Sequence, residues 1–224
     1  MKKLIFLVLS IIILYTVLSV SSCVKDECNI VGGEYEFVLQ FELSPADSVF
    51  HIGDTITITS KMSNPIYEKK TNTNYTLNDF KFYLVTSIYD MDTNIIDYEQ
   101  FNYFDLLIDS NYWYNISYYS SGESHLQLQY EYNDNNYNII FKLIPKKTGN
   151  FYLNQYSDIN YVGGKQYFDG KCDNVDNGAI VYMNERKDNN FHVMSEAKNE
   201  YYKEWSKHKE KYLDNGGYCF KVID

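Results

Sequence analysis

The cysteines are the residues of this chain whose positions imply the most specific chemistry. Four occur in 224 residues: Cys23, Cys28, Cys172 and Cys219. Cys23 follows Lys2, Lys3 and an apolar run over residues 4–20, with two serines in between. A short positive segment, an apolar run and then small residues are the order of a secretory signal. Cys23 therefore marks the predicted border between a removed signal, residues 1–22, and the exported chain.

The border itself, Val20-Ser21-Ser22-Cys23, resembles the lipobox of bacterial lipoproteins. In that family the cysteine thiol takes lipid and becomes the mature N-terminus. The resemblance implies that Cys23 carries a lipid and that the protein contacts the membrane through this anchor. An uncleaved membrane helix is the alternative, because about 17 apolar residues are near the lower limit for spanning a bilayer.

The residues after the border resemble a second signal. Lys25, Asp26 and Glu27 match the export signal of surface lipoproteins in Bacteroidota, a lysine followed by two acids just after the lipidated cysteine. The resemblance implies a domain held at the outer membrane and facing the cell surface. The alternative is an ordinary charged tether over residues 23–33.

If Cys23 carries lipid, three cysteines remain and one of them is unpaired. Export permits a disulfide. We expect Cys172 to pair with Cys219, because this bond ties the C-terminus to a loop rich in Gly and Asp. The pairs Cys28–Cys172 and Cys28–Cys219 stay open as alternatives. None of the cysteines has the spacing of metal ligands.

Residues for catalysis are sparse. No Glu-x-x-His element, Gly-x-Ser-x-Gly elbow or phosphate-binding loop occurs. Residues 173–178 match a calcium loop poorly, and Asx turns explain them better. Carboxylate pairs such as Asp105 and Asp109 suit a glycosidase, but 30 acidic residues make such pairs common. We therefore expect no enzyme, cofactor or metal, with a secreted hydrolase as the alternative.

Charge excludes one class of partner. Removal of residues 1–22 leaves 18 basic and 30 acidic residues, a net charge of −12. A chain this acidic repels phosphates, so we expect no nucleic-acid partner. The remaining 202 residues suit one domain with an appendage.

Alternating apolar and polar residues predict strands along much of the chain. Residues 34–43 place Phe37, Leu39 and Phe41 on one side, and residues 123–132 alternate in the same way. Residues 141–153 resemble the E-to-F corner of immunoglobulin-like domains, with Phe151 at the usual tyrosine position. The predicted fold is mainly β, an immunoglobulin-like antiparallel β-sandwich over residues 34–165.

The C-terminal part, residues 166–224, is predicted as a helix-containing extension packed on the sandwich. Ala197, Tyr201, Trp205, His208 and Tyr212 recur at helical spacing, so we expect one helix over residues 195–213. Ser195 is its expected cap, and Asn215-Gly216-Gly217 its end. The helix should dock through Tyr201, Trp205 and Tyr212, followed by a final strand.

The sequence thus predicts a surface lipoprotein with a binding or structural role. Tyr occurs 24 times, and most of these rings should pack within the sheets. Exposed rings such as Trp113 suit either a protein partner or a glycan, which makes a glycan-binding accessory lipoprotein the main alternative. Asp47-Ser48-Val49 and Asp54-Thr55-Ile56 resemble Bacteroidota O-glycosylation acceptors, so Ser48 and Thr55 are candidate modification sites.

Overall fold

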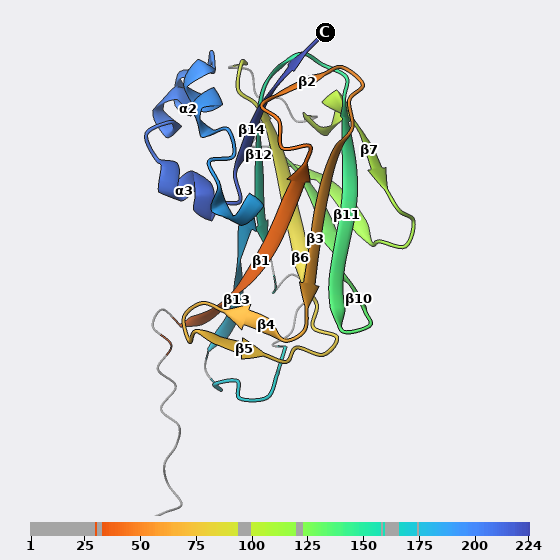
Figure 1. Ribbon diagram of the computed structural model, residues 1–224, viewed down its shortest axis with the longest axis vertical. Helices are drawn as coiled ribbons and strands as arrows, with labels where there is room; N and C mark the ends of the chain where they lie inside the picture. Colours follow the sequence, from red (N-terminus) through yellow and green to blue (C-terminus); the bar gives the residue numbers. More distant parts are fainter. Residues whose placement is uncertain are drawn as a thin grey trace, which may run out of the picture.

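The computed structural model describes residues 30, 33–93, 100–119, 123–157, 159, 166–173 and 175–224 (Figure 1). Two β-sheets pack face to face, and short helices lie along one side beside β12 and β14. Most strand pairs are antiparallel, and two pairs are parallel. The predicted mainly β fold, a sandwich of two sheets with C-terminal helical structure and a final strand, is confirmed. No helix among the described residues is long and apolar enough to cross a membrane.

The first sheet runs in the order β10-β11-β3-β1-β4-β5, with β13 paired to β1 and β7 paired to β11. Its strands are β1 (Glu34–Ser44), β3 (Ile56–Ser63), β4 (Ile66–Glu68), β5 (Thr73–Tyr75), β7 (Phe104–Ile108), β10 (Glu131–Asn133), β11 (Asn136–Pro145) and β13 (Asp176–Met183). β10 and β11 form a hairpin whose turn lies at residues 134–135. The short β4–β5 hairpin lies in the largely polar segment over residues 63–79.

The second sheet runs in the order β2-β14-β12-β6-β9-β8. Its strands are β2 (Val49–His51), β6 (Tyr83–Asp90), β8 (Tyr114–Tyr118), β9 (Ser124–Gln129), β12 (Gly149–Ser157) and β14 (Tyr218–Ile223). The helical elements are η1 (Gln100–Tyr103), η2 (Asn184–Arg186), η3 (Phe191–Glu196), α2 (Glu200–Trp205) and α3 (Lys209–Asp214). The segment after residue 166 therefore contributes one strand to each sheet as well as most of the helices.

The main core fills the space between the sheets. Phe37, Leu39 and Phe41 are buried there, as the alternation of β1 predicts. Leu126 and Leu128 of β9 enter the same core from the second sheet. Each such side chain contributes about 1.5–3 kcal/mol when fully buried, so the period-two pattern fixes which face of each sheet points inward.

A second, smaller core lies on the outer face of the second sheet, under the helices. Tyr152 and Cys219 project from β12 and β14, and Met194, Ala197 and Tyr212 cover them. The ring of Tyr212 stacks on Tyr152 with centroids 5.6 Å apart, and its hydroxyl donates to the carbonyl of Asn189. Burial raises the pKa of Tyr212 well above its usual value.

The prediction of one helix over residues 195–213 is wrong. The chain forms two short helices, α2 and α3, and His208 between them has non-helical dihedrals. Asn199 caps α2 through a bond from the Tyr201 backbone N–H, and Ser195 lies in the preceding 3₁₀ turn. The predicted face is interrupted at His208, whose φ of −118° and ψ of 55° lie outside the helical region.

Only part of the predicted helix docking is found. Tyr212 is buried, Trp205 packs partly against the second core, and Tyr201 is 60% exposed. The predicted stop at Asn215-Gly216-Gly217 is confirmed, because α3 ends at Asp214 and Asn215 is its C-cap. A Cβ on Gly217 would lie 2.6 Å from the Tyr212 ring, and Gly216 has a φ of +55°. Glycine is therefore required where α3 returns to β14.

The predicted Cys172–Cys219 disulfide is wrong. Cys219 is the free cysteine among the described residues, and it is buried in the second core. Burial raises the pKa of its thiol to about 12. Cys172 instead packs against the main core, where its backbone N–H donates to the Tyr35 hydroxyl. The bond does not form because Cys219 lies on β14 of the second sheet, whereas Cys172 lies beside Tyr35 of the first sheet.

Of the three pairings considered, only Cys28–Cys172 does not involve Cys219. Cys28 lies outside the described residues. We predict this bond, because Ile30 packs against the same core as Cys172 and the Asp176 N–H donates to the Gly33 carbonyl at 3.0 Å. Peptide mapping without reductant should recover a Cys28–Cys172 peptide, and alkylation should label Cys219 only after unfolding. Reduction should lower the unfolding midpoint, since a loop of this length contributes about 5 kcal/mol in the chain-entropy model. Recovery of three unlinked cysteine peptides would contradict the pairing.

A buried carboxylate ties the β4–β5 hairpin to β1. Glu68 has no exposed surface, and its Oε1 accepts from the Glu36 N–H at 2.6 Å and the Lys70 N–H at 3.0 Å. Its Oε2 accepts from the backbone N–H and the hydroxyl of Thr71, at 2.7 and 2.6 Å. Burial alone raises the pKa of Glu68, but these four bonds outweigh burial and hold the pKa below its ordinary value of 4.5.

Glu68→Gln should therefore destabilise the fold by about 2–3 kcal/mol at pH 7, because one acceptor oxygen becomes a donor that faces other donors. The lowered pKa means that ionised Glu68 stabilises the fold above about pH 4.5 and that this contribution is lost as the pH falls through the folded-state pKa. The difference between variant and wild type in urea unfolding should shrink below that pH. Glu42→Gln, on the exposed side of β1, is the control. An equal difference in unfolding free energy between variant and wild type at pH 3 and at pH 7 would refute the role of the ionised carboxylate.

Candidate functional site

The residues of the two predicted targeting signals cannot be placed. Cys23, Lys25, Asp26 and Glu27 lie outside the described residues. They remain sequence predictions.

The carboxylates considered for glycoside hydrolysis have structural partners. Asp105 forms an ion pair with Lys146 at 2.8 Å, and Asp109 accepts from the Asn111 N–H at 3.1 Å in a turn. Within the described ranges, no group of three or more His, Cys, Asp or Glu side chains is placed to hold a metal. Asp105 therefore belongs to a surface ion pair, and Asp109 stabilises a turn.

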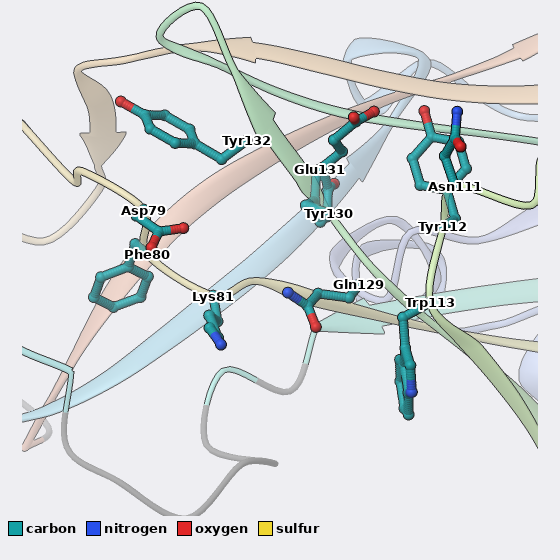
Figure 2. Close-up of a pocket in the computed structure, with 10 residues that line it drawn as sticks. All are labelled: Asp79, Phe80, Lys81, Asn111, Tyr112, Trp113, Gln129, Tyr130, Glu131 and Tyr132. Atoms are coloured by element: carbon teal, nitrogen blue, oxygen red, sulfur yellow. The ribbon is translucent and has the colours of Figure 1, made fainter.

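A polar pocket of about 260 Å³ lies where the chain crosses from the second sheet to the first (Figure 2). Tyr130, between β9 and β10, marks the crossing and donates its hydroxyl to Ser60 at 2.9 Å. Three segments line the pocket: residues 79–81 before β6, residues 111–113 before β8, and residues 129–132 at the crossing.

Trp113 supplies the exposed aromatic surface of this pocket. The turn after β7 brings it beside β9, where its carbonyl accepts from the Gln129 N–H at 3.0 Å. Its ring meets Tyr83 edge to face, with centroids 5.9 Å apart and planes at 89°. The side chain remains 46% exposed. The buried Tyr83 thus supports one edge of the indole, and part of the ring surface stays accessible to solvent.

One amide and one charged side chain lie on one side of the indole (Figure 2). In Figure 2, Gln129 lies between Lys81 and Trp113. The Tyr83 hydroxyl donates to Gln129 Oε1 at 3.2 Å, which orients the amide and leaves its NH₂ as a donor. Lys81 is positioned through its backbone, whose N–H donates to Gln166 Oε1 at 2.6 Å and whose carbonyl accepts from Gln166 at 3.0 Å.

Charged side chains complete the lining. Among the described residues, Asp79, Lys81 and Glu131 form no ion pair, although all three line the pocket. Tyr112 lies close to Glu131, and burial, with Glu131 and Asp109 adding to it, raises the pKa of its phenol. The pocket therefore holds neutral phenol, amide and indole groups with a few charges at its rim. These groups suit the binding of a polar ligand that has both hydroxyl groups and an apolar face.

A second hollow, of about 440 Å³, lies at the C-terminal end of β1. Glu42, Glu185 and Asp188 make it acidic, with Lys187 beside them. The adjoining residues of η2, Asn184, Glu185 and Arg186, all have positive φ. No exposed ring lines this hollow in the described part of the chain, because its tyrosine, Tyr218, is buried. The pocket at Trp113 is the better candidate for a binding site.

The sequence identified Trp113 as a candidate ring but not its partners. In β9, polar His125, Gln127 and Gln129 alternate with buried leucines. This alternation is the sequence signal that places the Gln129 amide on the outer face of the sheet, where Trp113 lies. Asp79 and Lys81 carry no such signal, because only strand pairing across the second sheet brings them to the pocket that Trp113 lines.

Comparisons with known proteins show distant resemblance to solved structures. No protein-family model and no curated protein sequence matches the chain. A non-cellulosomal cohesin from the hyperthermophilic archaeon Archaeoglobus fulgidus aligns over 85% of this chain and 92% of its own, at 10% identity and a TM-score of 0.28. The type II cohesin dyad from the adaptor ScaA scaffoldin of Acetivibrio cellulolyticus aligns over 64% of this chain and 46% of its own, at 12% identity and a TM-score of 0.30. Both are remote, and the β-sandwich assignment stands on the strand pairing of this chain.

Proposed function

We propose that this protein is a lipid-anchored surface protein that binds glycans through the pocket at Trp113. The exposed indole of Trp113 is the observation that carries the glycan assignment. A sugar ring offers an apolar C–H face to stack on an aromatic ring and hydroxyl groups around its edge. Gln129 supplies a donor and an acceptor for such hydroxyl groups beside the indole, and Asn111 and Asp79 supply others elsewhere in the pocket lining (Figure 2).

The size and chemistry of the pocket favour binding over catalysis. Ligand pockets usually measure about 300–1,000 Å³ and bury most of a small molecule. A hollow of about 260 Å³ is close to the lower end of that range, so it suits part of a longer ligand. Asp79 and Glu131 line the pocket, but both are exposed. A catalytic pair of carboxylates needs two different environments, so that one acts as the acid and the other as the base. The described residues give these two side chains no such difference.

The anchor is supported by the sequence around Cys23. A lipid on Cys23 and export through Lys25-Asp26-Glu27 would hold the domain at the cell surface, where extracellular polysaccharide is accessible. Residues 23–33 then form the tether that precedes β1.

Fractionation and protease treatment of intact cells test the anchor. Cys23→Ser should abolish fatty-acid labelling and release or mislocalise the protein, because the acceptor thiol is gone. Replacement of Lys25, Asp26 and Glu27 by alanine should keep the label but protect the protein from added protease. Labelling of Cys23→Ser at the wild-type level would contradict the lipoprotein assignment, and unchanged digestion of the triple variant would contradict surface export.

Affinity electrophoresis tests the glycan site with soluble polysaccharides: a mannan, a xylan, a β-glucan and a starch. At least one should retard the wild-type protein, and Trp113→Ala should weaken that binding about tenfold or more, as expected for a central aromatic contact. Tyr67→Ala is the matched control, because Tyr67 is 41% exposed on β4 of the other sheet. Both variants should melt near the wild-type temperature. Retardation of Trp113→Ala equal to wild type, or no retardation of the wild type by any of the four, would refute the proposal.

A further inference from the structure

The outer face of the second sheet continues the chemistry of the Trp113 pocket across four strands. Strand register gives the outward residues of β8, β9, β6 and β12, since their neighbours Leu126, Leu128, Leu84 and Leu153 point into the main core. These outward residues are Asn115, Ser117, His125, Gln127, Gln129, Tyr83, Val85, Ser87, Tyr89, Tyr152, Asn154 and Tyr156.

None of these twelve side chains is Asp, Glu, Lys or Arg, although the whole chain has 30 acidic and 20 basic residues. Glu123, just before β9, is a carboxylate at the border of the face, 3.7 Å from His125. Burial lowers the pKa of His125, although Glu123 opposes this, so the imidazole is neutral at pH 7. The outward positions of these four strands are therefore uncharged, and the charges lie at the border, on Glu123 and on Lys81 of the Trp113 pocket.

A second group of exposed rings lies on this face, away from Trp113. Tyr119 is 47% exposed and its ring lies 4.8 Å from the His125 ring. Tyr156 is 40% exposed, and its hydroxyl is 3.4 Å from His125 Nδ1. His125 thus joins the two tyrosines into one aromatic cluster.

The two aromatic groups are separated by the length of β8. Trp113 and Tyr119 flank β8 on the same side of the strand, six residues apart, which corresponds to about 20 Å of extended chain. Asn115 and Ser117 lie between them and bond to each other, Nδ2 to Oγ, at 2.9 Å. The middle of the face is not accessible to a ligand, because Val85, Ser87 and Gln127 are buried. A ligand that contacts both ring groups must therefore be long and must lie along the rim at β8.

We infer that the ligand is a neutral oligosaccharide chain that extends along β8 from Trp113 to the Tyr119–His125–Tyr156 cluster. This inference rests on the proposed function and deepens it by naming the ligand's length and charge. Rings at both ends stack on sugar faces, and the amide and hydroxyl groups between them bond to sugar hydroxyls. The twelve outward positions hold no basic residue, and the basic side chain of the Trp113 pocket is Lys81, so a chain of uronic acids would meet an acidic protein with little positive charge along this path.

Calorimetry with graded oligosaccharides of whichever polysaccharide retards the wild type tests the length. Wild-type affinity should rise as the oligosaccharide grows from two sugars to several. Tyr119→Ala and Tyr156→Ala should each remove most of that rise, three- to tenfold for the longest chain, and leave the Kd for the shortest ligand unchanged. Tyr201→Ala, an exposed ring on α2, is the control.

The outcomes separate the two levels of the proposal. If both tyrosine variants bind the longest chain like the wild type while Trp113→Ala still fails, the path along β8 is wrong and the Trp113 site stands. If Trp113→Ala also binds normally, the proposed function fails. Polygalacturonate provides the charge test: weaker retardation than by the neutral polymer supports the inference, and equal retardation overturns the neutral assignment.

Discussion

The pairing of β1 with three different strands is the constraint on which the first sheet depends. From Glu34 to Phe41 it pairs in parallel with β13, from Glu42 to Ser44 it pairs with β3, and at Phe37 it meets β4. One register must satisfy all three partners, and it turns the rings of β1 into the core. Glu68 holds the β4–β5 hairpin onto β1 through the Glu36 N–H, so a buried charge supports the strand that organises the sheet.

The crossing at Tyr130 links that sheet to the candidate site. β9 belongs to the second sheet and β10 to the first, with one residue between them. Tyr130 is buried at this point and bonded to Ser60 of β3, which fixes where the chain leaves β9. Gln129, the last residue of β9, thereby meets Trp113 and Tyr83. The geometry of the pocket thus follows from the same hydrogen bond that joins the two sheets.

Local patterns predicted the strands with strict alternation, because side-chain period and burial agree there. β1 falls on the alternating residues 34–43, and β9 falls within the alternating residues 123–132. The β4–β5 hairpin was missed because its stability comes from Glu68 and from pairing with β1, neither of which is visible in polar residues 63–79. The disulfide was mispredicted for a similar reason: the position of β14 in the second sheet depends on contacts far apart in sequence. At the site, Trp113 was predictable from its type, while Asp79 and Lys81 are brought to it only by tertiary pairing.

The edge strand β8 connects the charge of the protein to its binding surface. Residues 110–122 contain no Asp, Glu, Lys or Arg, although exposed edges are usually protected from self-pairing by charged side chains. Charged side chains at this edge would hold water on the surface that we assign to a neutral glycan, and the glycan would have to displace that water on binding. An edge without charged side chains avoids this desolvation cost. The remainder of the chain carries the net charge of −10, which repels a second copy before two β8 edges approach. Long-range repulsion by the whole domain can therefore replace local protection, and β8 can keep the uncharged aromatic sequence that stacking on sugars requires.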